Sequence, residues 1–284
     1  EAALKNLTWR NIGPAIMGGR IDDFAVVESD PRVVYVGTAS GGIWKTVNGG
    51  TTTTPVFFRE RTVALGAAAV SQTNPDVVWV GTGEGCSRNS SGWGDGVYLS
   101  KDGGTTWTNV GLRDSRHISR IVIHPKNENI VFVGAVGHLW GPNEERGLFK
   151  TTDGGKTWKA LFPKVVRDDD GAKYLYWHKD EPIGRGWMGD IDIDPFAPAR
   201  VMYVTGQGIW ASEDVSAADA DKPTHWTFLN RGLEETVVHG LVSPPSGPPL
   251  LSVVGDLCGF RHDDLDVVWT HRTWGPPPDP NYTW

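Results

Sequence analysis

Ser100-Lys-Asp102-Gly-Gly104-Thr-Thr-Trp107 and Thr151-Thr-Asp153-Gly-Gly155-Lys-Thr-Trp158 are two copies of one eight-residue pattern, Ser/Thr-x-Asp-x-Gly-x-Thr-Trp. A third copy, Thr46-Val-Asn48-Gly-Gly50-Thr-Thr-Thr53, has Asn in place of Asp and Thr in place of Trp. A fourth, less regular copy starts at Ser212-Glu-Asp214, and we expect it to end at Trp226 after an insertion. Asp102 and Asp153 are 51 residues apart. A repeat of this length indicates one supersecondary unit that is used several times.

Each residue type in this pattern has a structural role in a tight turn. The Asp or Asn side chain accepts hydrogen bonds from nearby backbone N–H groups and holds a tight turn. The Gly pair allows positive φ, and the Trp is large enough to attach the hairpin to its neighbour. The pattern resembles the Asp-box, the hairpin signature of sialidase-like, sortilin-like and related β-propellers. This resemblance implies an all-β propeller of Asp-box repeats and a structural role for Asp102 and Asp153, because Asp-boxes usually lie away from the active site.

A second repeated element precedes each Asp-box. A turn with Pro is followed by β-branched and aromatic residues, which predicts a buried inner strand within 30–37, 74–81, 124–134 and 194–205. A Gly turn then leads to a short strand at 42–45, 96–99, 147–150 and 208–211. Three or four strands per unit are typical of a propeller blade.

We predict one β-propeller domain over 1–270 with about 5–7 blades. Its repeats lie near 24–60, 70–110, 118–162, 185–230 and 234–270, and the last has a strand at 250–254 without an Asp-box. Residues 7–9 are a candidate closing strand, 163–184 a charged insertion, and 271–284 an irregular Pro-rich tail. Seven such units would need roughly 350 residues, so the ring is small, has short blades or is incomplete here.

Composition limits the partners. The formal charge is -7 with no basic block, which argues against nucleic acid. No apolar stretch approaches the ~20 residues of a membrane-spanning helix, and no signal peptide is visible. The sequence begins without Met, as in a processed or trimmed form. Sequons at Asn6, Asn89 and Asn281 weakly favour a secreted or periplasmic location. The sequence leaves open whether Cys86 and Cys258 pair or are two buried thiols, and it does not indicate the oligomeric state.

The segment Gly186-Trp-Met-Gly-Asp190-Ile-Asp192-Ile-Asp194-Pro195-Phe196 carries the clearest candidate chemistry. Alternation along a strand places Asp190, Asp192 and Asp194 on one face. Their mutual repulsion should raise at least one pKa, which suits a general acid. For Asp194 we favour the structural alternative, in which it caps the turn before Pro195.

This segment, with 202–206, 232–236, 241–247 and Gly255-Asp-Leu-Cys-Gly-Phe-Arg-His-Asp-Asp-Leu265, resembles glycoside hydrolase family 74. The resemblance covers about residues 184–267. It implies a xyloglucan-specific endoglucanase or reducing-end cellobiohydrolase, of a family built from two seven-bladed propellers. In that family a Gly-Asp-x-x-Ile-Asp-Pro-Phe segment carries the catalytic acid on its first Asp, which corresponds to Asp190.

The resemblance leaves the catalytic base unassigned. The family's base lies in a Thr-Asp-Ile-Gly-Gly stretch, and here Ala39 replaces that Asp within Thr38-Ala39-Ser40-Gly41-Gly42. Residues 8–160 are more similar to bacterial sortilin-like Asp-box proteins. The candidates for the base lie in Gly-rich loops beside strand ends: Asp22, Asp23, Glu84 and Asp95.

Aromatic residues are candidate sugar platforms, because 14 Trp are more than a core of this size needs. The candidates are Trp93, Trp140, Trp177 and Trp187, and ordinary packing is the alternative for each. We interpret His262-Asp263-Asp264 as a loop that orients Asp190 or substrate, or as a satisfied turn. Asp168-Asp-Asp170 is interpreted as a solvated acidic loop. We predict no metal and no cofactor.

Two functions follow. The first is inverting hydrolysis of a β-1,4-glucan such as xyloglucan, with Asp190 as general acid and a second carboxyl about 6.5–9.5 Å away. The second is a non-catalytic propeller that binds a protein, peptide or glycan partner. The Asp190 segment favours the first function, and the loss of the base at Ala39 favours the second.

Overall fold

The computed structural model describes residues 19–86, 90–141, 143–168, 188–206, 208–231, 233, 237–254 and 258–266. Strands dominate this part of the chain, together with the short 3-10 helices η2 (Arg113–Ser115) and η4 (Val215–Ala220). Within these ranges, no helix has the length and apolar character needed to cross a membrane.

The first three sheets are four-stranded antiparallel meanders. The first sheet contains β1 (Ile21–Val26), β2 (Val34–Thr38), β3 (Gly42–Thr46) and β4 (Thr54–Phe57). The second contains β5 (Leu65–Val70), β6 (Val78–Thr82), β7 (Val97–Ser100) and β8 (Thr108–Gly111). The third contains β9 (Ile118–His124), β10 (Asn127–Ala135), β11 (Gly147–Thr151) and β12 (Lys159–Ala160).

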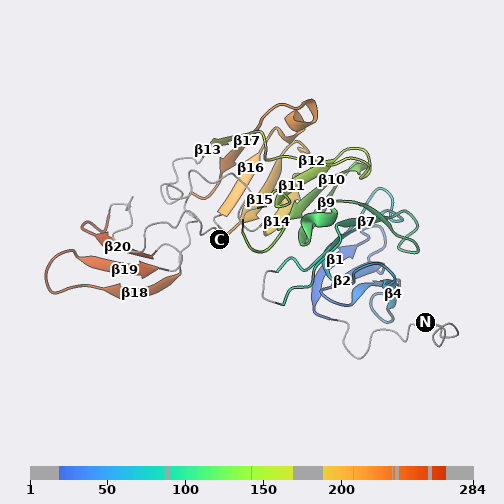
Figure 1. Cartoon of the computed structure of the whole chain (residues 1–284), viewed down its shortest axis with the longest axis horizontal. Coiled ribbons are helices and arrows are strands. Elements are labelled where there is room, and N and C mark those ends of the chain that lie inside the picture. The colour runs from blue at the N-terminus through green and yellow to red at the C-terminus, as the bar shows by residue number, and fades with distance from the viewer. Residues whose placement is uncertain are drawn as a thin grey trace, which may run out of the picture.

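The fourth sheet adds a fifth strand to this plan. It contains β14 (Asp190–Ile193), β15 (Val201–Thr205), β16 (Gly208–Ser212) and β17 (Thr224–Phe228), and β13 (Val165–Asp168) pairs in parallel with β17. The fifth sheet contains β18 (Val238–Val242), β19 (Leu250–Val254) and β20 (Cys258–His262). Figure 1 shows the first four sheets one after another, with β18 to β20 apart from them.

The strands expected from the repeats are present. β2, β6 and β10 overlap the predicted buried runs and extend one residue beyond them, and β15 lies within its run. β3, β7, β11 and β16 match the short strands to within one residue, and β19 matches 250–254. One detail is corrected. The buried runs form the second strand of each sheet, whereas β1, β5, β9 and β14 form the edge where neighbouring sheets meet.

The core lies between the sheets. One cluster joins the first and second sheets and includes Phe57 and Tyr98, and a second joins the second and third sheets and includes Trp79 and Ile118. A third joins the third and fourth sheets and includes Phe132. Full burial of such a side chain contributes about 1.5–3 kcal/mol. Face-to-face packing of successive sheets therefore holds the first four together.

The Asp-boxes are structural turns, as predicted. Asp102 Oδ1 accepts hydrogen bonds from the backbone N–H groups of Thr105 and Thr106 at 3.0 and 2.9 Å. Its Oδ2 accepts one from the Thr106 hydroxyl at 2.6 Å. These bonds, led by the Thr106 hydroxyl, lower the pKa of Asp102 to about 2, and bonds from Thr157 do the same for Asp153. In the fourth copy, His225 N donates to Asp214 Oδ1 at 2.8 Å, so the turn closes next to Trp226 across the insertion.

The Trp residues of the two complete Asp-boxes attach their sheets to the preceding ones. Trp107 Nε1 donates to the Val56 carbonyl at 2.8 Å, and Trp158 Nε1 donates to the Val110 carbonyl at 2.7 Å. The acceptors lie on β4 and β8, the last strands of the preceding sheets. The repeat is therefore joined by hydrogen bonds as well as by apolar packing.

Candidate functional site

Asp190 occupies the exposed face of β14. Asp190 and Asp192 are exposed, whereas Ile191 and Ile193 are buried, which confirms the predicted alternation. Asp190 Oδ1 accepts a hydrogen bond from the Ile191 N–H at 2.8 Å. The strand therefore presents this carboxylate to solvent.

Asp194 is a turn residue. Its Oδ1 accepts hydrogen bonds from Phe196 N at 2.8 Å and Ala197 N at 3.1 Å. These bonds lower the pKa of Asp194, and the guanidinium of Arg200 assists. The prediction that Asp194 caps the turn is confirmed. Its pKa is lowered, whereas repulsion among the three carboxylates would raise a pKa.

Arg120 on β9 joins the predicted acid to one candidate base. Its Nε lies 2.9 Å from Asp190 Oδ1, an ion pair without the alignment of a hydrogen bond. Its Nη1 donates to Asp23 Oδ1 on β1 at 3.4 Å. Three edge strands, β1, β9 and β14, thus contribute to one charged group. Sequence reasoning missed Arg120, because a lone Arg in a strand carries no motif.

The two contacts with Arg120 set an upper limit on the distance between the Asp23 and Asp190 carboxylate oxygens. The two contacts are 2.9 and 3.4 Å long, and about 2.3 Å separates Nε from Nη1 in the planar guanidinium, so the oxygens lie within about 9 Å. Inverting glycosidases hold their carboxyls about 6.5–9.5 Å apart with water between them. Here a guanidinium bridges the pair.

Asp23 is built into the sheet. Its Oδ2 accepts a hydrogen bond from Ala68 N at 2.9 Å, and its Oδ1 accepts one from Phe24 N at 2.8 Å. Its side chain is only 14% exposed. Asp22 is half-buried and falls at a register shift between β1 and β2, and such bulges redirect side chains.

Glu84, another candidate base, lies in a pocket of about 670 Å³. Ala39, at the position to which the sequence resemblance assigns the family's base, lines the same pocket. Glu84 is buried, one of its carboxylate oxygens pairs with Arg20, and Oε2 accepts a hydrogen bond from Gly92 N at 2.9 Å. The pocket therefore offers a carboxylate close to the position of the lost one.

Trp93 lines this pocket and is 64% exposed. The Arg116 guanidinium lies 4.4 Å from the centre of its ring, and the Thr62 hydroxyl donates to its carbonyl at 3.0 Å. An exposed, oriented indole can serve as a stacking surface for a sugar. Trp140 is 74% exposed and does not line the pocket. Trp177 and Trp187 lie outside the described residues.

The remaining candidates have local partners. Asp95 accepts hydrogen bonds from the Tyr98 hydroxyl at 2.9 Å and from Arg113 Nη1 at 2.8 Å. His262 Nε2 lies 2.8 Å from Ser252 Oγ on the neighbouring strand. Asp263 pairs with Arg261 at 2.7 Å. His262 ends β20 in the fifth sheet and Asp263 follows it directly, and this sheet lies apart from the sheet that contains Asp190 (Figure 1).

Two further features of the described residues concern possible ligands. Cys86 is exposed and free, so the prediction of a buried thiol is wrong for Cys86.

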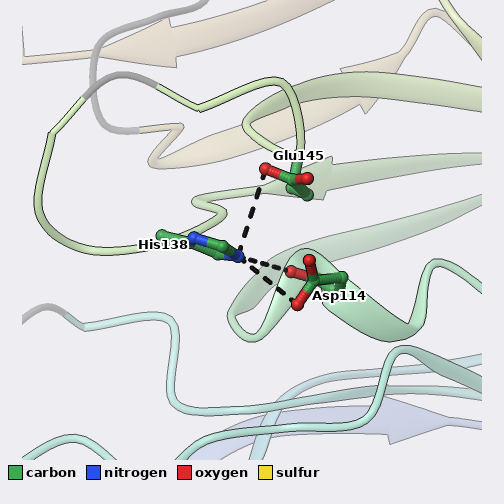
Figure 2. A group of neighbouring side chains, drawn as sticks. All are labelled: Asp114, His138 and Glu145. Atoms are coloured by element: carbon green, nitrogen blue, oxygen red, sulfur yellow. Dashed lines mark hydrogen bonds and ion pairs between the residues drawn. The ribbon is translucent and has the colours of Figure 1, made fainter.

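Asp114, His138 and Glu145 bring three potential metal ligands together (Figure 2). No metal was predicted from the sequence, in which these three residues form no motif because they come from two separate loops.

Comparison with known proteins identifies relatives. No family model matches the chain. Xyloglucanase Xgh74A of Acetivibrio thermocellus is 29% identical over 92% of this chain and 42% of that protein. A probable oligoxyloglucan-reducing end-specific xyloglucanase of Neosartorya fischeri is 30% identical over 82% of this chain and 26% of that protein. The chain thus spans less than half the length of these curated relatives.

The fold has solved counterparts. The crystal structure of the GH74 xyloglucanase from Xanthomonas campestris superposes with a TM-score of 0.54. Sequence identity is 24%, and the match covers 89% of this chain and 45% of that chain. At 24% identity, this structural similarity shows the fold alone. The predicted resemblance to glycoside hydrolase family 74 is confirmed: this chain is xyloglucanase-like in sequence, and its fold is an all-β propeller of Asp-box repeats.

Proposed function

We propose that this protein is a glycoside hydrolase that cleaves a β-1,4-glucan such as xyloglucan, with inversion. The observation that carries the proposal is the 29–30% identity to xyloglucanases over most of this chain. A polymeric substrate of this kind is met outside the cytoplasm, so we also propose a secreted or periplasmic protein.

In the proposed mechanism, Asp190 donates a proton to the glycosidic oxygen as the bond to the anomeric carbon breaks. A second carboxylate takes a proton from the water that attacks the opposite face. Asp23 is the candidate base that shares the Arg120 guanidinium with Asp190. For this chemistry Arg120 must swing away, so that the Asp190 ion pair opens and water enters. Glu84 is the alternative base, beside Ala39.

Substrate would bind along the pocket that holds Trp93. The exposed indole supplies an apolar face for a pyranose ring, and Glu60, Arg61 and Ser40 line the same pocket with groups that can bind hydroxyls. Many weak polar contacts of this kind, with one stacked ring, are suited to a neutral polysaccharide.

Two observations favour a second candidate function, a non-catalytic propeller that binds a glycan, peptide or protein. Ala39 cannot act as a base, and the Arg120 guanidinium bridges Asp23 and Asp190 where hydrolysis needs water. In this alternative the Arg120 ion pairs are structural and remain closed.

The test is release of reducing ends from xyloglucan by the native chain and by Asp190→Asn and Asp23→Asn. Asp192→Asn is the matched control, because Asp192 shares the exposed face and bonds to its following backbone N–H in the same way, at 2.8 Å. Loss of a general acid or base should lower kcat about 10²–10⁴-fold. Full activity in Asp190→Asn would remove it from the mechanism. Xyloglucan binding without hydrolysis by the native chain would support the second function.

A further inference from the structure

Asp114, His138 and Glu145 lie on two loops that meet beside the third sheet. Asp114 belongs to η2, before β9, while His138 and Glu145 belong to the loop between β10 and β11. Figure 2 shows the two carboxylates facing one ring nitrogen of His138. From this arrangement we infer that the three side chains bind a divalent transition-metal cation of the zinc class.

The spacing suits a common ion. His138 Nε2 lies 3.5 Å from Asp114 Oδ1 and 4.0 Å from Glu145 Oε2, and one donor atom from each residue lies within 4.8 Å of the others. Two ligands bound to zinc at tetrahedral angles are about 3.4 Å apart, given bonds of about 2.1 Å. To reach this spacing, Glu145 Oε2 must move about 0.6 Å closer to His138 Nε2, and the most widely separated pair of donor atoms must close by at most about 1.4 Å.

The donor chemistry selects the class of ion. An imidazole nitrogen with two carboxylates suits zinc and its first-row neighbours, whereas calcium and magnesium prefer all-oxygen ligands. The Asp114 carbonyl oxygen lies 3.1 Å from His138 Nε2. When a metal binds His138 Nε2, the hydrogen bond between this nitrogen and the Asp114 carbonyl is lost. The carbonyl oxygen can then serve as a fourth metal ligand, and water can complete the coordination shell.

The loop that carries His138 is held from two sides. Asn143 Oδ1 accepts a hydrogen bond from His138 N at 3.1 Å, and its Nδ2 donates to the His138 carbonyl at 3.0 Å. Arg146 is buried and donates from Nε to the Val136 carbonyl at 2.8 Å and from Nη2 to the His138 carbonyl at 2.6 Å. A ligand held by its own surroundings loses little entropy when it binds a metal.

The segment that carries Asp114 is constrained as well. Leu112 and Arg116, on either side of η2, have φ of 52° and 58°, which non-Gly residues adopt rarely. Such backbone conformations cluster at functional sites. Arg116 Nε lies 3.6 Å from Asp114 Oδ1, so the incoming cation would take the place of this guanidinium.

A buried imidazole lies next to these loops. His117 is fully buried, and among the described residues its Nε2 has no hydrogen-bond partner. Val136 N donates to the His117 carbonyl at 2.9 Å, so His117 lies where the two ligand-bearing segments join. An unsatisfied nitrogen at this depth is costly, although His117 is not one of the three ligand residues.

The experiment is calorimetric titration of Zn²⁺ into the EDTA-treated chain in a Cys86→Ser background, which removes the exposed thiol as a competing ligand. His138→Ala and Glu145→Gln test the site. His225→Ala is the matched control, because His225 pairs with Asp214 at 2.7 Å on the exposed surface and is not among the three ligands. We expect one zinc per chain, at least tenfold weaker binding in both site variants, and unchanged binding in the control.

A second measurement is independent of any hydrolytic activity. Zn²⁺ should raise the Tm of the parent and of His225→Ala, but not that of Glu145→Gln, whose near-isosteric side chain preserves the fold. Ca²⁺ should give no comparable shift. Equal zinc affinity in parent, His138→Ala and Glu145→Gln would overturn the assignment, and so would the absence of stoichiometric binding in the parent. A larger effect of Ca²⁺ than of Zn²⁺ would overturn the class of ion.

Discussion

Arg120 Nε lies 2.9 Å from Asp190 Oδ1, and this contact links β9 to β14. The same guanidinium donates to Asp23 on β1 at 3.4 Å. Asp23 is 14% exposed and Asp190 is 59% exposed, so one end of the bridge is sheltered and the other open to water. The bridge therefore links the edge strands β1, β9 and β14 at a sheltered carboxylate and leaves its Asp190 end exposed to solvent.

Arg120→Met should lower the free energy of unfolding by about 1–2 kcal/mol, because it leaves the sheltered Asp23 carboxylate without its cation. The exposed Asp190 end should contribute little, since water screens it. Urea denaturation measures the change. In the double variant Arg120→Met/Asp23→Asn, part of the loss should be recovered. Additive effects of the two substitutions would show that the Asp23–Arg120 contact is not energetically coupled.

The fold could be predicted because its determinants are local. Each Asp-box turn is made by side chains within a few residues of Asp102 or Asp153, and each buried strand is a continuous apolar run. The alternation over 190–193 likewise follows from one strand. These features can be recognised from the sequence alone, because they do not depend on which other segments pack beside them.

The candidate site was harder to predict because it joins distant segments. Asp23 and Asp190 meet only through Arg120, which lies 97 residues from Asp23. The three residues of the proposed zinc-class site, Asp114, His138 and Glu145, come together only when two loops fold against each other. No short sequence motif indicates such contacts. His262 and Asp263, which the sequence resemblance also suggested for the site, lie apart from Asp190 at the end of β20.

Trp158→Phe should lower the free energy of unfolding by about 1 kcal/mol, the net value of one hydrogen bond. The substitution removes the Nε1 bond to the Val110 carbonyl but keeps an aromatic ring near Trp79, with which Trp158 packs edge-on at 6.2 Å between centroids. Thermal denaturation followed by circular dichroism measures the change. Trp140→Phe is the control and should be neutral, since Trp140 is exposed. Equal Tm values for both variants would contradict the role of the Trp158 bond.

The acid dependence of stability should report on the Asp-boxes. The pKa of Asp153 is about 2, below its ordinary value of 3.8, because Thr157 and its neighbours bond to the ionised form. Its contribution is therefore fully present above pH 3.8 and is lost as the pH falls toward 2. Asp153→Asn should lower the Tm at pH 7, with a smaller difference from the native chain at pH 2.5. A Tm difference that stays constant between pH 7 and pH 2 would contradict this assignment.

Gly155 and Gly50 offer a matched pair at the same position of two Asp-boxes. Their φ values are 84° and 87°, so alanine at either position meets the same backbone strain, about 1–2 kcal/mol. A Cβ at Gly155 would lie 3.0 Å from Val110 and 3.1 Å from Trp79, whereas a Cβ at Gly50 would meet nothing within 4 Å. Gly155→Ala should therefore destabilise the protein more than Gly50→Ala, by an amount that measures the packing of the third sheet against the second. Urea denaturation of the two variants gives this difference directly, and equal losses would show that Val110 and Trp79 shift to accept the methyl group at no cost.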